Sequence, residues 1–366
     1  MTNIVNNKKD LVSFFRGIAI LMVVMVHSFQ AFDVSSVAKF VPRFGQMGCQ
    51  FFFILSAYCL CMSNAKKATK VGLFYSRRFL SLAPGYWMTI LINLFIVALS
   101  TIIFGYSIYN VDTKLVDIIL NLLLLHGFVP FWGPMNSVVM GGWFVGTLAI
   151  FYLLFPILHK LYFYDNLRWK SIRPFIFPLG ITIICSLLII ISGIGQDTYC
   201  VNSSVKYFSF INQLPSFAFG FSLYDLAQNG KNKFYFPLAI VFFLATIVLF
   251  YNPCKISFVY APTLMTAFVL FLFLSLNGWE STNKISSFIC NLGDKSYAIY
   301  LSHFWIMFAL IDLIKELAGN IELGISNDVI YLLSLPFTLL LVYLLAMGYD
   351  KMISWLKLRI SSLLTE

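Results

Sequence analysis

The feature that most constrains this chain is a series of apolar runs, each long enough to cross a bilayer, that repeats along almost its whole length. Of its 366 residues, 60% are hydrophobic and only 11% are charged. A soluble domain carries about a quarter charged residues. We therefore predict an all-α, polytopic integral membrane bundle in which residues 1–366 form a single domain.

About ten of these runs have the length of a transmembrane helix. They lie at residues 11–32, 44–63, 83–104, 143–159, 174–194, 207–227, 234–251, 258–277, 297–317 and 328–348. A shorter apolar stretch, residues 115–128, is predicted to be re-entrant or interfacial. With that assignment every basic cluster lies on one side of the membrane. Since cytoplasmic loops carry the excess of Lys and Arg, both termini are predicted to be cytoplasmic.

The net charge of +10 does not indicate a nucleic-acid partner, because the basic residues lie in short clusters between apolar runs, where they set topology. The seven cysteines include no CxxC pair and no histidine at metal-ligand spacing, so no metal site is predicted. Cys200 and Cys254 fall in predicted outer loops, where they either form a disulfide or remain unpaired.

The first span carries two polar side chains that are costly inside a membrane, Arg16 and His27. Eleven residues make about three helical turns, so both project from one face, separated by about 16 Å along the axis. Arg16 could simply anchor the helix at the cytoplasmic interface. His27 could simply hydrogen-bond to a neighbouring helix.

Five segments, in order, resemble the membrane acyltransferase-3 superfamily, which includes bacterial O-acetyltransferases of surface polysaccharides. They are "RGIAILMVVMVH" (16–27), "GCQFFFILSAYCL" (48–60), "FYSRRFLSLAPGYW" (74–87), "GGWFVGTLAIFYLLFP" (141–156) and "LGDKSYAIYLSH" (292–303). Together they extend over most of the chain, and five ordered matches are far more specific than one.

The resemblance implies acyl transfer from a cytoplasmic thioester, with acetyl-CoA as the expected donor, to a hydroxyl of a cell-surface or lipid-linked glycan. Acyl transfer needs a base for the hydroxyl proton. We predict that His27 is this base, and that Arg16, the other predicted catalytic residue, lies at the end that meets the donor.

Coenzyme A carries phosphates, which require cations on the cytoplasmic side. Arg77 and Arg78 supply them at the start of the third span, and Arg78 is the better candidate of the two. The alternative is a cluster that only sets topology. The family pattern prefers a further arginine three residues after Arg78, and Ser81 occupies that position.

The segment that begins at Trp143 departs from the family pattern at one position. A glutamate five residues after the tryptophan is common in the family, and Leu148 stands there. Leucine cannot hold a proton, so either His27 works as the sole base or activity has been lost. Thr147 can hydrogen-bond but not ionise.

Three further positions are predicted to contribute to the site. Tyr300 and His303, neighbours on one helix face, are predicted to bind the donor, unless His303 is a packing residue. His126, in the re-entrant stretch, is predicted to shape the acceptor entrance. Trp143 is predicted to stack on a sugar ring, unless it is an aromatic residue of ordinary lipid-facing or interfacial packing. His159 is expected to be interfacial.

The predicted function is therefore a membrane O-acyltransferase with no permanently bound cofactor, acting on an acyl-CoA donor and a glycan acceptor. The resemblance implies a bacterial inner-membrane location. Two alternatives remain, namely an exporter or flippase of lipid-linked glycan and a catalytically silent relative. Transporters often contain paired halves with matching broken helices, and the sequence has no such repeat.

Overall fold

The computed structural model describes residues 2–30, 34–66, 70–105, 114–128, 138–164, 169–191, 205–230, 232–252, 257–305, 307 and 326–363. These residues form helices joined by turns, and no strand occurs among them. The prediction of an all-α polytopic membrane protein is confirmed.

Six helices in the described ranges are long and apolar enough to cross a membrane by length and composition: Lys9–Gln30, Ser36–Ala65, Val71–Ile103, Trp143–Tyr162, Arg173–Ile191 and Asn327–Ile360. Each overlaps one of the predicted spans. Two shorter apolar helices, Tyr235–Tyr251 and Val259–Ser275, coincide with two more. The predicted span 207–227 corresponds to a helix over Phe210–Leu226. Of the predicted span 297–317, residues 297–305 and 307 are described and the others lie outside the described residues.

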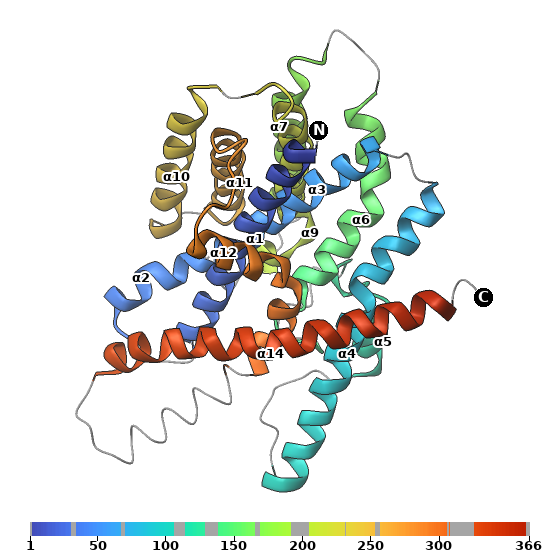
Figure 1. Ribbon diagram of the computed structural model, residues 1–366, viewed down its shortest axis with the longest axis vertical. Helices are drawn as coiled ribbons and strands as arrows, with labels where there is room; N and C mark the ends of the chain where they lie inside the picture. Colours follow the sequence, from blue (N-terminus) through green and yellow to red (C-terminus); the bar gives the residue numbers. More distant parts are fainter. Residues whose placement is uncertain are drawn as a thin grey trace. The chain divides into compact units, whose positions relative to one another are not determined.

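The chain forms two compact units, residues 1–49 with 279–366, and residues 50–278. We describe each by itself. The first unit contains α1 (Thr2–Gln30), α2 (Ser36–Phe44), the 3-10 helix η1 (Gly45–Met47), α12 (Lys284–Asp294) and α14 (Asn327–Leu363). In Figure 1, α12 lies beside α1, and α14 is the long red helix.

Glycines allow the helices of the first unit to approach α1 at backbone distance. A Cβ on Gly17 would lie 2.0 Å from the carbonyl oxygen of Ile289, and one on Gly293 would lie 1.7 Å from that of Ser13. On the η1 side, a Cβ on Gly45 would lie 2.2 Å from the Met22 carbonyl oxygen. Small residues permit this close packing in membrane helices. The helix that carries Arg16 and His27 is thereby held tightly by its neighbours.

The second unit begins within α3 (Gly48–Lys66) and continues through the following helices: α4 (Val71–Phe104), α5 (Leu115–Leu122), η2 (His126–Phe128), α6 (Trp143–Tyr162), α7 (Arg173–Ile191), α8 (Val205–Phe208), α9 (Phe210–Leu226), α10 (Tyr235–Tyr251) and α11 (Ser257–Ser275). Helix α10 packs along α11, and α7 along α9 (Figure 1). Aromatic rings fill its core, as where Phe155 stacks on Phe221 with ring centroids 5.6 Å apart.

The apolar stretch 115–128 is too short to cross the membrane as one helix. Helix α5 ends at Leu122, and Leu124 has a φ of 58°, the left-handed conformation that a leucine rarely adopts. The chain then turns into η2, where a Cβ on Gly127 would lie 2.4 Å from the carbonyl carbon of Gly146 in α6. The stretch therefore folds against α6, as a re-entrant or interfacial segment would.

Candidate active site

His27 lies near the end of α1 and its ring orientation is set within its own helix. Its Nδ1 is 3.0 Å from Oε1 of Gln30. An amide oxygen only accepts, so Nδ1–H donates and Nε2 keeps its lone pair. The position of His27 thus leaves one ring nitrogen able to accept a proton.

His303 lies next to His27, although the two are far apart in the sequence. Their ring centroids are 5.3 Å apart, and Phe304 packs against both at 4.5 and 4.2 Å. Nδ1 of His303 is 2.7 Å from the carbonyl oxygen of Tyr300, so its Nδ1–H also donates. Its Nε2 is buried and has no hydrogen-bond partner among the described residues. The first unit therefore contains two adjacent imidazoles, each with Nε2 as the unprotonated nitrogen.

Tyr300 lies beside His303. Its ring centroid is 5.8 Å from that of His303, as expected for residues three apart on one helix. Arg16 is half-buried in the same helix as His27. The residues predicted for base catalysis and two of those predicted for the donor thus occur together in the first unit.

Arg77 and Arg78 lie in the first turns of α4, in the second unit. Arg77 is exposed, whereas Arg78 is partly buried with its guanidinium 5.9 Å from the centre of the Phe74 ring. Nε of Arg78 is buried without a hydrogen-bond partner in the described part of the chain. The hydroxyl of Ser81 donates to the carbonyl of Arg78 at 2.6 Å, within its own helix.

His126 lies in a buried polar cluster of the second unit. Its Nε2 is 3.0 Å from the carbonyl oxygen of Gly142 and 3.2 Å from the hydroxyl of Tyr86, and the Tyr86 ring stacks on it. Tyr86 in turn donates to Oδ1 of Asn121 at 2.6 Å. Burial lowers the pKa of the His126 imidazole, which favours its neutral form.

Trp143 begins α6 among aromatic rings. Its ring centroid is 5.0 Å from that of Phe208 and 5.9 Å from that of Tyr207. Leu148, at the position where a glutamate is common in the family, is a core residue, 6% exposed. The neighbouring Thr147 hydroxyl is buried without a partner among the residues described.

Two other sequence predictions concern histidine and cysteine side chains. His159 is half-buried near the end of α6, where its Nε2 accepts from the Asn64 amide at 3.1 Å. Cys200 and Cys254 lie outside the described residues, so their pairing stays a prediction.

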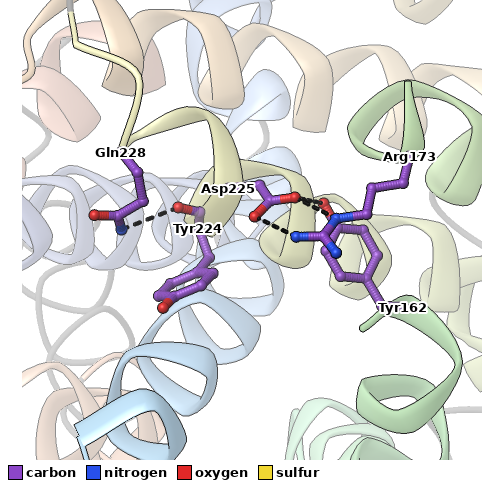
Figure 2. A network of polar contacts seen from close by, with 5 residues as sticks. All are labelled: Tyr162, Arg173, Tyr224, Asp225 and Gln228. Carbon is purple, nitrogen blue, oxygen red and sulfur yellow. Dashed lines mark hydrogen bonds and ion pairs between the residues drawn. The ribbon is translucent and has the colours of Figure 1, made fainter. Parts of the chain in front are cut away.

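A polar network in the second unit was not predicted from sequence. The Arg173 guanidinium donates to both carboxylate oxygens of Asp225 at 2.6 and 2.9 Å, and the Tyr162 hydroxyl donates to Oδ2 at 2.9 Å. Figure 2 shows Arg173 and Tyr162 reaching Asp225 together. The three residues come from α7, α6 and α9, so the network joins these helices.

The fold and these side chains define an all-α membrane protein with a pair of adjacent histidines in one unit and a cationic helix start in the other. A family model described as an acyltransferase domain, the acyltransferase-3 model, matches residues 12–347. The chain belongs to this acyltransferase family. No curated protein and no solved structure matches it, so the family assignment rests on this match.

Sequence reasoning missed the approach of His303 to His27. A weak signal was present, since both histidines end a family-like segment within an apolar run. The two histidines are 276 positions apart, and no local pattern predicts that they are in contact. The role of every residue in this site remains a prediction.

Proposed function

We propose that this protein is a membrane O-acyltransferase that moves an acyl group, expected to be acetyl, from acyl-CoA to a hydroxyl of a cell-surface or lipid-linked glycan. The observation that supports this most is the pair His27 and His303, each with its Nδ1–H engaged and its Nε2 unprotonated. A base oriented by a second group is the arrangement that activates a hydroxyl nucleophile.

In the proposed reaction, Nε2 of His27 takes the proton of the acceptor hydroxyl as its oxygen attacks the thioester carbonyl carbon. The tetrahedral intermediate then collapses, the carbon–sulfur bond breaks, and the sulfur leaves with the bonding electrons. The imidazolium of His27 returns the proton to that sulfur, which gives free coenzyme A and the O-acyl product. General base catalysis of this kind contributes about 10²–10⁴-fold to a rate.

Gln30 takes the orienting position that a carboxylate occupies in a serine–histidine–aspartate triad. An amide oxygen holds the imidazole in the productive tautomer, but it carries no charge to stabilise the imidazolium. In this proposal His27 is the sole base, so the reaction does not need the glutamate that is common in the family at the position of Leu148. His303 and Tyr300, predicted on the donor side, lie beside the proposed base, as the donor's acyl end must.

The donor's phosphates are proposed to contact Arg77 and Arg78, and the glycan to contact Trp143 and His126. The surrounding membrane is proposed to be a bacterial inner membrane, with both termini in the cytoplasm. Arg16 is proposed to contact the donor at the cytoplasmic end of the first span.

The test is release of free thiol from acetyl-CoA by protein purified in detergent, with and without glycan acceptor. We expect His27→Ala to abolish acceptor-dependent thiol release and Arg78→Ala to raise the KM for the donor. Ile18→Ala, a half-buried change on the same helix as His27, is the matched control and should keep its activity.

Normal activity of His27→Ala would contradict the assigned base. No thiol release by the wild-type protein with any acyl-CoA would instead favour the silent relative or the glycan exporter.

A further inference from the structure

A cavity of about 390 Å³ lies in the second unit, beside the first turns of α4. Its walls come from α4, α6 and the residues that follow α5, and most are hydrocarbon, as at Phe79, Leu82, Leu124, Ala149 and Leu153. Several of its outer wall residues are among the exposed large hydrophobic side chains, including Phe79 (40% exposed) and Leu153 (43%). Exposed apolar side chains at the edge of a cavity are better suited to contact with hydrocarbon chains than with water.

Most polar groups on its wall are already bonded within the protein. The Tyr75 hydroxyl donates to the carbonyl of Leu153 at 3.1 Å, and the Ser76 hydroxyl donates to that of Gly72 at 3.1 Å. Arg78 is the one cation on the wall, and its buried Nε has no partner among the described residues. The cavity thus combines a mostly apolar wall with a single cation whose Nε is unpartnered among the described residues.

Arg78 also lines a second, much smaller cavity of about 20 Å³, shared with Ser63, Asn64 and Arg77. A space of this size holds about one water molecule. Arg78 therefore stands at the junction of a small polar site and a larger apolar one.

The small polar cavity and the larger apolar cavity lie along α4 in the same order as the headgroup and the chain of a lipid. Arg78 lies in the predicted cytoplasmic end of the helix, and Leu82 lies one turn further along, about 6 Å deeper at 1.5 Å per residue. A phospholipid of the cytoplasmic leaflet has the same order, with its phosphate at the interface and its chain toward the bilayer centre.

We propose that this cavity binds one acyl chain of a net-negative phospholipid, such as phosphatidylglycerol, whose phosphate contacts Arg78 between the two cavities. Arg77 adds a second cation, and Ser63 and Asn64 offer polar groups to a hydroxylated headgroup. A choline headgroup would bring its own cation against the two arginines, which disfavours zwitterionic lipids.

A sugar or a coenzyme A pantetheine arm suits this cavity less well than a hydrocarbon chain. Their hydroxyl and amide groups would lose hydrogen bonds to water without gaining partners on the apolar walls. The lipid would occupy the same arginine that the proposed function assigns to the donor, yet its binding can be measured without any activity.

The test is native mass spectrometry of the purified full chain after exchange into equimolar phosphatidylglycerol and phosphatidylcholine with identical chains. We expect retained phosphatidylglycerol to exceed phosphatidylcholine about fivefold, the factor that one basic residue contributes near an anionic membrane. Arg78→Gln should lower this ratio, because it removes the cation that lines both cavities. Ala149→Phe and Leu153→Trp, which fill the cavity, should lower the retention of both lipids.

Ala98→Phe is the matched control, because Ala98 is an exposed position of α4 about 30 Å along the helix from Arg78. It should retain lipid as the wild type does. Equal retention of the two lipids by the wild type, or unchanged retention in both cavity-filling variants, would overturn the proposal. Complete displacement of phosphatidylglycerol by an equimolar prenyl phosphate would also overturn it and assign the cavity to a lipid-linked acceptor.

Discussion

The two units of this chain differ in how their helices pack around polar side chains. In the first unit, helices meet α1 at glycines, and the histidine pair is held by short contacts within single helices. In the second unit, aromatic rings fill the core, and cavities remain beside Arg78 and Arg173. Close backbone packing suits a site that must hold two imidazoles in fixed geometry, whereas cavities suit the binding of large flexible molecules.

The largest expected effect tests whether the chemistry belongs to the first unit. His27→Ala should lower kcat of acyl transfer by about 10²–10⁴-fold, because it removes the proposed base. Measured by thiol release, Trp143→Phe in the second unit should act on the KM for the acceptor instead. If Trp143→Phe lowered kcat as much as His27→Ala does, the chemical step would not belong to the first unit alone.

A second prediction concerns the glycine contacts that hold α1. Gly293→Ala should destabilise the protein by about 1–3 kcal/mol or more, since its Cβ would overlap the Ser13 carbonyl oxygen and force the helices apart. The measurement is thermal unfolding in detergent. Gly348→Ala in α14 is the control, because a Cβ there meets nothing within 4 Å, and it should be neutral or stabilise by up to about 1 kcal/mol.

A third prediction concerns the ion pair that joins helices of the second unit. Asp225→Asn should lower the free energy of unfolding by about 2 kcal/mol, because a carboxylate that accepts three hydrogen bonds is replaced by a neutral amide. Tyr162→Phe, which removes one of these bonds, should cost about 1 kcal/mol. Equal unfolding temperatures for Asp225→Asn and the wild type would show that the aromatic packing alone holds these helices.

The smallest expected effect sharpens the role of the α4 cations. Ser81→Arg should tighten coenzyme A binding about fivefold, because it adds a third cation to the start of α4. The Ser81 hydroxyl that is lost donates only to the Arg78 carbonyl within the same helix. Isothermal titration with coenzyme A measures this. Ser81→Gln has a similar reach without the charge and should leave the affinity unchanged, so an equal gain in both variants would contradict a phosphate contact.

The spans could be predicted because hydropathy and length are local properties of the chain. The run predicted at 143–159 is a helix over Trp143–Tyr162, and that at 234–251 is a helix over Tyr235–Tyr251. The short stretch 115–128 was also recognised as no ordinary span, although only the structure gives the left-handed turn at Leu124 that ends α5.

The candidate site was only partly predictable. The sequence pointed to His27 and Arg78 as separate features, because each lies in a family-like segment. It carried no sign that His303 lies against His27, that Gly17 and Gly293 meet backbone atoms of other helices, or that a cavity lies beside Arg78.

By itself the sequence determined that this chain is an all-α membrane protein, because long apolar runs form helices in lipid. It also determined the acyltransferase family, because the family's motifs are local segments that occur in a fixed order along the chain. Only the tertiary structure decided which imidazoles are neighbours, which ring nitrogens are unprotonated, and where hydrocarbon-lined space remains. The approach of the two imidazoles joins residues hundreds of positions apart, the cavity is lined by three separate segments of the chain, and the hydrogen bond of each ring depends on the rotamer it adopts when packed, so no local sequence pattern encodes them.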